Sequence, residues 1–348
     1  MSPYVFMIFL LSLGLGTTLT FASSHWLLAW MGLEINTLAI LPLMIQHHHP
    51  RAVEATTKYF LIQATAATTI LFAATMNAWM TGEWLISNMS HPATTTLMTM
   101  ALALKIGLAP LHFWLPEVLQ GLDLMTGLIM STWQKLAPLI LLIQIAHNTD
   151  PMILTILGIF SALIGGWGGL NQTQLRKMLA YSSIAHLGWM TIITQFSPQL
   201  TILTLSMYIL MTSAIFLTFK LMTTTMISTL ALNWSKNPTL IIMATLILLS
   251  LGGLPPLTGF MPKWLILQEL TKQSLPMPAT IMAMSALLSL YFYLRLCYSM
   301  SLTIMPNMNN ALMPWRLSNL QTTMPLTISA VLALMLLPIT PTILTTMF

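Results

Sequence analysis

The stretch LALKIGLAPLHFWLPEV, residues 102–118, places one lysine, Lys105, in an apolar run and interrupts that run with Pro110 and Pro116. A charged side chain near the middle of a membrane span costs roughly 2.5–3.5 kcal/mol on insertion scales, so it normally marks an ion pathway or a paired site. Proline removes a backbone donor, and non-helical backbone at membrane depth persists only where protein buries it or where it lines a water-filled cavity. The stretch therefore predicts a proton or ion site on a discontinuous membrane helix.

The composition is typical of a membrane protein. Hydrophobic residues make up 56% of the 348 residues and charged residues only 5%, and the mean hydropathy is +0.82. Seven acidic residues and twelve lysines and arginines are too few to hydrate the surface of a soluble domain of this length. The basic residues behind the net charge of +5 are scattered singly, which argues against nucleic-acid binding.

The cysteine count limits the chemistry that this chain can carry. Cys297 is the one cysteine, so it has no partner for an internal disulfide or for a paired-cysteine metal site. The run His47, His48 and His49 is not expected to bind metal, because three adjacent histidines cannot all face one ion. We therefore expect no iron–sulfur cluster, no bound cofactor and no metal in this chain.

The N-terminal residues 1–21 predict a first membrane span that stays on the protein. They lack the basic region of a secretory signal and the arginine-rich pattern of a transit peptide. Thirty methionines, many where isoleucine or leucine would serve, form a second unusual feature. This bias follows if isoleucine codons are read as methionine, as in animal mitochondrial genomes, and it indicates a mitochondrially encoded chain.

The hydropathy pattern predicts an all-α polytopic membrane protein with about eleven transmembrane helices. Each span needs roughly 20 apolar residues. The segments that qualify are about 3–22, 25–45, 55–80, 94–119, 124–146, 151–170, 175–196, 199–225, 238–271, 276–300 and 323–346. The connections are short apart from a polar surface loop at 301–322, so residues 1–348 are expected to form one integral membrane domain.

The charged loops predict the orientation of the helices. Loops after even-numbered spans carry six basic residues, which are Arg51, Lys58, Arg176, Lys177, Lys236 and Arg316. Loops after odd-numbered spans carry Glu83, Asp150, Glu269 and only Lys272. Basic loops stay on the matrix or cytoplasmic side. The N-terminus is therefore predicted on the matrix side and the C-terminus on the intermembrane-space side.

An internal repeat suggests a transporter architecture. GLAPLHFWLPE at 107–117 aligns without gaps to GLPPLTGFMPK at 253–263 and shares glycine, leucine, proline, leucine and proline with it. The two copies fall on the fourth and ninth predicted spans, so they enter the membrane from opposite sides. Inverted repeats with broken helices are typical of secondary transporters. We expect inverted repeats at roughly 25–146 and 151–300, two discontinuous helices, and a last helix at roughly 323–346.

Buried charges are the candidate functional residues. Near the centres of their spans lie Glu34, Lys105, Lys135 and Lys263. Together they would cost on the order of 10–14 kcal/mol on insertion scales, so pairing, hydration or a function must offset that cost. A nearby carboxylate changes how tightly a desolvated lysine holds its proton. Movement of Glu34 relative to Lys105 would thus switch that lysine between holding and releasing a proton.

Each of these residues also has a structural interpretation. Lys105, Lys135 and Lys263 lie beside prolines, so their ammonium groups could cap carbonyls that the prolines leave without donors. Glu34 could belong to a fixed salt bridge. His112 and His186 are candidate proton relays, although a lone histidine in a helix bundle is often a hydrogen-bonded core residue.

Three segments carry a resemblance to a known family. KIGLAPLHFWLPEVLQG (105–121), LRKMLAYSSIAHLGWM (175–190) and LGGLPPLTGFMPKWLIL (251–267) resemble the antiporter-like subunits of respiratory complex I, which are similar to subunits of multi-subunit sodium/proton antiporters. The resemblance implies that Glu34 pairs with Lys105, that Lys135 is a bridging lysine and that Lys263 is a terminal lysine. One departure is Thr258, which stands where the first repeat has His112, so a histidine relay is supported on one side only.

The resemblance also implies a setting and partners. It implies a proton-translocating membrane subunit of NADH:ubiquinone reductase in the mitochondrial inner membrane, with no redox centre of its own. FMN, iron–sulfur clusters, NADH and ubiquinone would be used elsewhere in the complex. The partners implied are the neighbouring antiporter-like chain 4, small membrane subunits and lipids such as cardiolipin. Two alternatives stay open, a subunit of a sodium/proton antiporter and a structural scaffold of the membrane arm without its own proton path.

Overall fold

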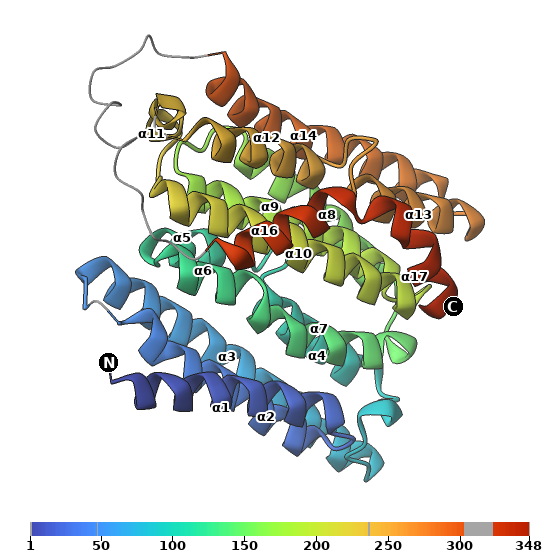
Figure 1. The fold of residues 1–348 in the computed structure, drawn as a ribbon. Coiled ribbons are helices and arrows are strands. Elements are labelled where there is room, and N and C mark those ends of the chain that lie inside the picture. The colour runs from blue at the N-terminus through green and yellow to red at the C-terminus, as the bar shows by residue number, and fades with distance from the viewer. Residues whose placement is uncertain (1, 47, 236, 303–322, 348) are drawn as a thin grey trace. The chain divides into compact units, whose positions relative to one another are not determined.

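The structure is a computed structural model of the chain that describes residues 2–46, 48–235, 237–302 and 323–347 (Figure 1). Within these ranges it is helical and contains no β-strand. Two isolated bridges join loop segments, His25 with Leu85 and Gln174 with Met226. The predicted surface loop at 301–322 falls almost entirely outside the described residues.

The chain divides into two compact units, and the boundary falls inside one helix. The first unit comprises residues 1–161 and 194–196, and the second comprises 162–193 and 197–348. Helix α8 (Pro151–Gly169) contains the boundary, after Ser161.

The first unit is built from seven helices among its described residues. They are α1 (Pro3–Ala22), α2 (Trp26–Met44), α3 (Pro50–Thr81), α4 (Pro92–Ile106), α5 (Trp114–Gly121), α6 (Leu124–Ser131) and α7 (Trp133–Ile145). Glycines allow α1 and α2 to touch through their backbones, since a Cβ added to Gly16 would lie 2.9 Å from the carbonyl oxygen of Gly32. Small residues at such a crossing are typical of helix packing in membranes.

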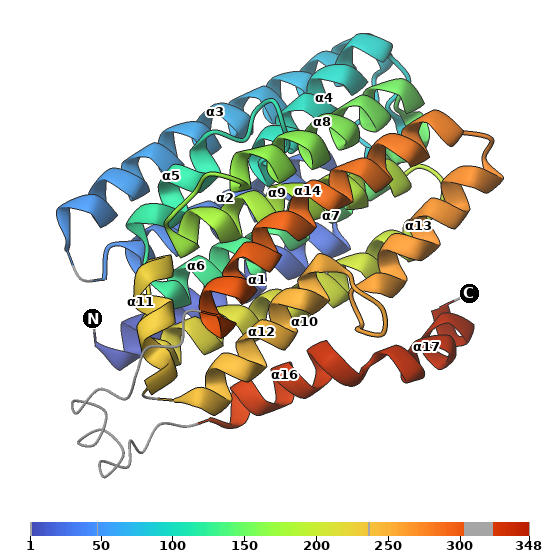
Figure 2. The same cartoon turned by 90° about the horizontal axis from the view of Figure 1, so that it is seen from above.

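The second unit contains the α-helices that follow α8. They are α9 (Leu175–Ile193), α10 (Pro198–Met222), α11 (Ile227–Leu232), α12 (Pro238–Gly252), α13 (Phe260–Lys272), α14 (Pro276–Ser301), α16 (Met324–Met335) and α17 (Thr340–Met347). Figure 2 shows the loop that turns from α12 into α13. Helix α10 supplies much of the core, because it packs on α9, α12, α13 and α16.

Both predicted helix breaks are present, at matching positions of the repeat. Helix α4 ends before Gly107, whose φ is +87°, and helix α12 ends before Gly253, whose φ is +80°. Only glycine adopts this left-handed conformation without strain, and it is the usual residue just past a helix end. The next helix starts seven residues later in both copies, at Trp114 and at Phe260. Each break also contains one cis X–Pro peptide bond.

The count of eleven spans is not confirmed. Seven described helical segments are long and apolar enough to cross a membrane, and α12 and α16 are shorter apolar helices. The predicted spans at 94–119 and 238–271 are each divided by their break into two helices. The predicted fifth span, 124–146, is also divided at Thr132, between α6 and α7. Each part of the spans at 94–119 and 238–271 is shorter than the bilayer requires of an unbroken helix, whereas Leu124–Asn148, with its interruption at Thr132, still forms one apolar segment of 25 residues.

Candidate functional site

A small polar cavity lies inside the first unit, between α2, α3, α4, α5, α6 and α7. About 20 Å³ of it is open to the centre of a water molecule, which is room for roughly one water. Its polar lining comes from Asn36, Thr37, Tyr59, Gln63, Lys105, Gln134 and Lys135. Two of the lysines predicted as functional therefore face the same space.

Lys105 enters this cavity from the last turn of α4. Its side chain is only 6% exposed. Its Nζ is buried and has no hydrogen-bond partner among the described residues. A buried ammonium without a protein acceptor needs water or a carboxylate to offset desolvation. The cavity offers room for that water.

Glu34 lies on α2 close to this cavity but makes a different contact. Its Oε2 accepts a hydrogen bond of 3.2 Å from the Thr37 hydroxyl, which also donates to the Glu34 carbonyl at 2.8 Å. No ion pair joins Glu34 to Lys105 in the part of the chain that the structure describes. Its charge is near enough to act on the Lys105 ammonium. The resemblance implies that Glu34 and Lys105 form a pair. In this conformation their charges are near each other, but the two side chains do not touch.

Lys135 is placed by the break between α6 and α7. The Thr132 N–H and hydroxyl both bond to the Leu128 carbonyl, at 3.0 and 2.7 Å, and α7 then starts at Trp133. Lys135 lies in the first turn of α7 and is 2% exposed. Pro138 lacks the N–H that would bond to the Gln134 carbonyl one turn earlier.

Sequence reasoning missed this third break and the contact that fixes α7. Gln134 donates from Nε2 to the Asn36 carbonyl of α2 at 3.2 Å. The adjacent hydroxyls of Ser131 and Thr132, followed by Pro138, are the signal that could have indicated an irregular helix here.

Lys263 occupies a different position from Lys105 relative to its break. It follows the second break, in the first turn of α13, and its Nζ donates to the Gly252 carbonyl at the end of α12 at 2.8 Å. Its stem lies against Gly253, where an added Cβ would be 2.9 Å from Lys263 Cδ. The sequence allowed two roles for Lys263, a proton carrier and a cap for a helix carbonyl. In this conformation it makes the capping contact.

The two histidines lie apart from the cavity lining. His112 is buried in the first break, with its ring centroid 4.4 Å from that of Phe113. His186 belongs to α9 in the second unit, and its ring centroid is 5.6 Å from that of Tyr208 on α10. Neither contributes to the lining of the cavity between Lys105 and Lys135. Thr258, which replaces a second histidine, donates to the Ala333 carbonyl of α16.

Arg295 is a half-buried charge that sequence reasoning overlooked. It lies on α14 and donates to the carbonyls of Leu170 and Gln172, in the loop that follows α8. In the sequence it shows the same pattern as the candidate lysines, namely a single charged residue in an apolar run, YFYLRLCYS. Its bonds to backbone carbonyls indicate that it holds this loop in place.

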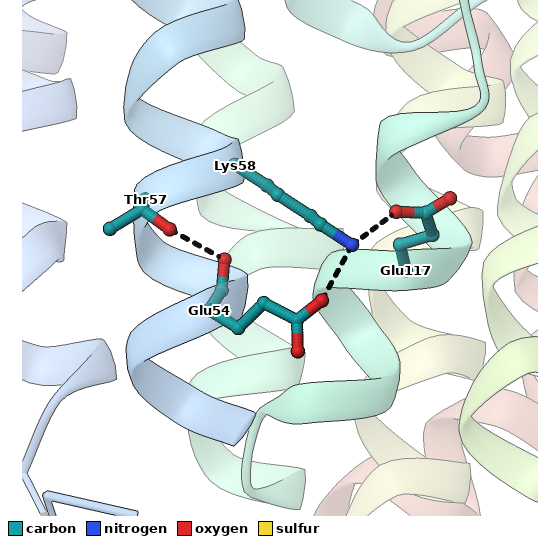
Figure 3. A network of polar contacts seen from close by, with 4 residues as sticks. All are labelled: Glu54, Thr57, Lys58 and Glu117. Atoms are coloured by element: carbon teal, nitrogen blue, oxygen red, sulfur yellow. Dashed lines mark hydrogen bonds and ion pairs between the residues drawn. The ribbon is translucent and has the colours of Figure 1, made fainter. Parts of the chain in front are cut away.

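An ion-pair cluster ties the second half of the first broken helix to α3. Lys58 lies between Glu54 and Glu117, with Nζ 2.8 Å from a carboxylate oxygen of each (Figure 3). The three side chains are 42–64% exposed, so the pairs contribute little stability. The described residues contain no group of three metal-binding side chains.

Comparison with known families and relatives places the chain clearly. A model of the family described as "NADH:quinone oxidoreductase/Mrp antiporter, TM" matches residues 23–289, and one described as "NADH dehydrogenase subunit 2 C-terminus" matches 290–344. The chain is 71% identical over 345 residues to NADH-ubiquinone oxidoreductase chain 2 of Carassius auratus and 69% identical over 344 residues to that of Danio rerio. Both alignments cover 99% of each chain.

Solved structures share this fold. A chain of respiratory complex I from Thermus thermophilus with bound aureothin is 27% identical, with a TM-score of 0.81 over 97% of this chain and 80% of that one. A chain of the Mrp complex from Dietzia has a TM-score of 0.75 over 84% of this chain and 59% of that one. It is 17% identical, so that likeness concerns the fold alone.

Proposed function

Because the chain belongs to the NADH:quinone oxidoreductase/Mrp antiporter family and matches the C-terminal model of NADH dehydrogenase subunit 2, we propose that it is a membrane-arm subunit of respiratory complex I. In this subunit, Lys105 and Lys135 carry protons. The observation that carries this proposal is the cavity that the two buried lysines share. Relatives about 70% identical over their full length are subunits of NADH-ubiquinone oxidoreductase.

The chemistry follows from the cavity and its charges. An ammonium that meets only water in a small cavity can pass a proton to that water, and a second lysine on the same water can accept it. Lys105 and Lys135 both line the cavity, which has room for roughly one such water. Glu34 accepts a hydrogen bond from Thr37, which lines the cavity, and a carboxylate close to a lysine changes how tightly that lysine holds its proton. A change in the distance between Glu34 and Lys105 would then couple events elsewhere in the complex to release of the proton.

The proposal extends to the second unit and to the setting. Lys263, with His112 and His186 as relay groups, would continue proton transfer once its capping contact is released. The chain would lie in the mitochondrial inner membrane with its N-terminus on the matrix side. Its partners would be chain 4, small membrane subunits and cardiolipin. FMN and iron–sulfur clusters in other subunits would transfer electrons from NADH to ubiquinone.

Replacement of Lys105 by methionine tests the proposal. The variant Lys105→Met keeps the length of the side chain and removes its proton. We expect the assembled complex, reconstituted in vesicles, to lose proton pumping in proportion to the share carried by this subunit. Pumping is measured as vesicle acidification per NADH oxidised, beside quinone-reductase activity.

The matched control is Lys58→Met. It makes the same substitution at an exposed lysine that lies outside the cavity lining, and we expect it to pump as the wild type does. Undiminished pumping by Lys105→Met would favour the scaffold alternative. The sodium/proton antiporter alternative predicts that pumping stops in sodium-free vesicles, whereas proton translocation by complex I continues there.

A further inference from the structure

The helix before the first break is capped by neutral side chains from elsewhere in the unit. The indole Nε1 of Trp114, on α5, donates to the Leu104 carbonyl at 3.1 Å. The Gln63 amide, on α3, donates to the Lys105 carbonyl at 3.4 Å. Carbonyls of the last turn have no partner within their own helix, and here uncharged groups supply the donors.

The second break lacks the indole, and a charge takes part in its capping. Phe260 stands at the repeat position of Trp114, so no indole N–H is present there. The Gly252 carbonyl, at the repeat position of Ile106, accepts a hydrogen bond from the Lys263 ammonium at 2.8 Å, and the Ser250 carbonyl, at the repeat position of Leu104, accepts one from the Gly253 N–H at 2.9 Å. The repeat therefore shows two ways to cap the same kind of helix end, one without a charge and one with the candidate proton carrier itself.

The difference between the breaks bears on Lys105. A lysine in the last turn of a helix commonly bonds to the carbonyls of that turn, where the helix dipole also favours a cation. Lys105 makes no such bond among the described residues, and its Nζ has no hydrogen-bond partner there. The carbonyls of Leu104 and Lys105 are already bonded to Trp114 and Gln63.

The two capping side chains are themselves held by the surrounding structure. Gln63 is 3% exposed and lies one turn after Tyr59 on α3. The Tyr59 ring centroid lies 5.8 Å from that of Trp114. Gly107 admits the indole, because a Cβ added there would lie 3.3 Å from Trp114 Cζ2. One face of α3 thus supports the indole and supplies the amide.

We propose that Trp114 and Gln63 are positioning residues, which keep the Lys105 ammonium free for the cavity by occupying the carbonyls that it would otherwise cap. The inference rests on the proposed role of Lys105 as a proton carrier. Without the indole, the ammonium bonds to the Leu104 carbonyl, as Lys263 bonds to Gly252. A lysine held in this way keeps its proton more tightly and releases it less readily to the cavity.

The test is Trp114→Phe, which removes the N–H, keeps an aromatic ring and reproduces the residue found in the second repeat. In a cryo-EM map of the assembled variant complex, we expect Lys105 Nζ within about 2.7–3.2 Å of the Leu104 carbonyl. We also expect the pH profile of pumping to move to higher pH by roughly half to one unit, the shift that one hydrogen bond corresponds to. Gln63→Met removes the second neutral cap and should move the profile in the same direction.

The matched control is Trp30→Phe. The Trp30 indole donates to the Ala67 carbonyl between α2 and α3 at 3.0 Å, away from the cavity lining, so its pH profile should coincide with that of the wild type. The proposal is overturned if Lys105 Nζ stays in the cavity in Trp114→Phe, or if the profiles of Trp114→Phe and Gln63→Met also coincide with the wild type. If Trp114→Phe does not assemble, Gln63→Met decides by the same two measurements.

The map and the Lys105→Met experiment keep the two proposals distinguishable. The position of Nζ tests the capping by Trp114 whether or not Lys105 carries protons. A moved ammonium together with undiminished pumping by Lys105→Met would uphold the capping and reject the proton role. An unmoved ammonium together with lost pumping by Lys105→Met would reject the capping by Trp114 and uphold the proton role of Lys105.

Discussion

Lys263 follows the second break in sequence, yet its ammonium group bonds to the helix that precedes the break. Its Nζ lies 2.8 Å from the Gly252 carbonyl, at the negative end of the α12 dipole. This contact offsets part of the cost of a lysine at membrane depth without any counter-ion. Proton transfer from Lys263 therefore requires that the contact be broken or that the carbonyl find another donor.

Two substitutions separate the role of Lys263 as a cap for the Gly252 carbonyl from its proposed role as a proton carrier. Lys263→Arg keeps a cationic donor for the carbonyl but does not release its proton in proteins. We expect it to assemble with an unchanged melting temperature and to pump less than the wild type. Lys263→Met removes the donor as well. It should also lower the stability of the complex by about 1 kcal/mol, the usual cost of leaving a carbonyl without its partner.

The measurements are thermal unfolding of the purified complex and vesicle acidification. Wild-type pumping by Lys263→Arg would show that the lysine serves only as a cap. An unchanged melting temperature for Lys263→Met would show instead that the bond to Gly252 does no more than offset the cost of burying the ammonium group.

At the level of elements, the second break depends on close backbone approach as well as on proline. A Cβ added to Gly259 would lie 1.7 Å from the Ser250 carbonyl oxygen, so only glycine allows the loop to pass the end of α12. The Gly253 N–H bonds to the same carbonyl at 2.9 Å. The loop that leads into Lys263 is thus packed directly onto the preceding helix.

Gly259→Ala should therefore disrupt the second break. The added methyl group cannot fit without moving the backbone, so we expect loss of assembled complex or a clear drop in its melting temperature. Gly14→Ala is the matched control, because nothing lies within 4 Å of the Cβ it would add on α1. Normal assembly of Gly259→Ala, seen on native gels, would contradict this packing.

The sequence predicted the elements whose cause is local and missed those whose cause is distant. Pro110 and Pro116, together with the repeat of their stretch at 253–263, predicted both broken helices correctly. The break at Thr132 is a local exception: the Thr132 hydroxyl bonds to the Leu128 carbonyl and the nearest following proline is Pro138, so periodicity alone did not indicate it. The Gln63 cap joins residues 42 positions apart, and only the folded structure brings them together.

At the level of the whole molecule, the pattern of apolar runs and single charges was enough to predict the fold class, and the resemblance of three segments indicated the family. The number of spans was less accessible, because broken helices and polar ones such as α9 do not resemble simple apolar spans. The placement of Lys135 beside the cavity of Lys105 also depends on tertiary packing. The orientation of the helices rests on the loop charges, and it is open to direct measurement.

Two exposed loop positions test that orientation. Glu83 follows the third span and Asn171 follows the sixth, and both are exposed. Basic loops stay on the matrix side, so Asn171→Cys should react with a membrane-impermeant maleimide added to the matrix face, and Glu83→Cys with reagent added to the opposite face. The native Cys297 is buried, so the band of this chain from the unsubstituted complex should show little background labelling in sealed vesicles of either orientation. Opening the vesicles with detergent should label both variants, which confirms that each position is reachable. Labelling of the two variants from the reversed faces would overturn the predicted orientation and, with it, the assignment of Lys58 and Lys177 to the matrix side.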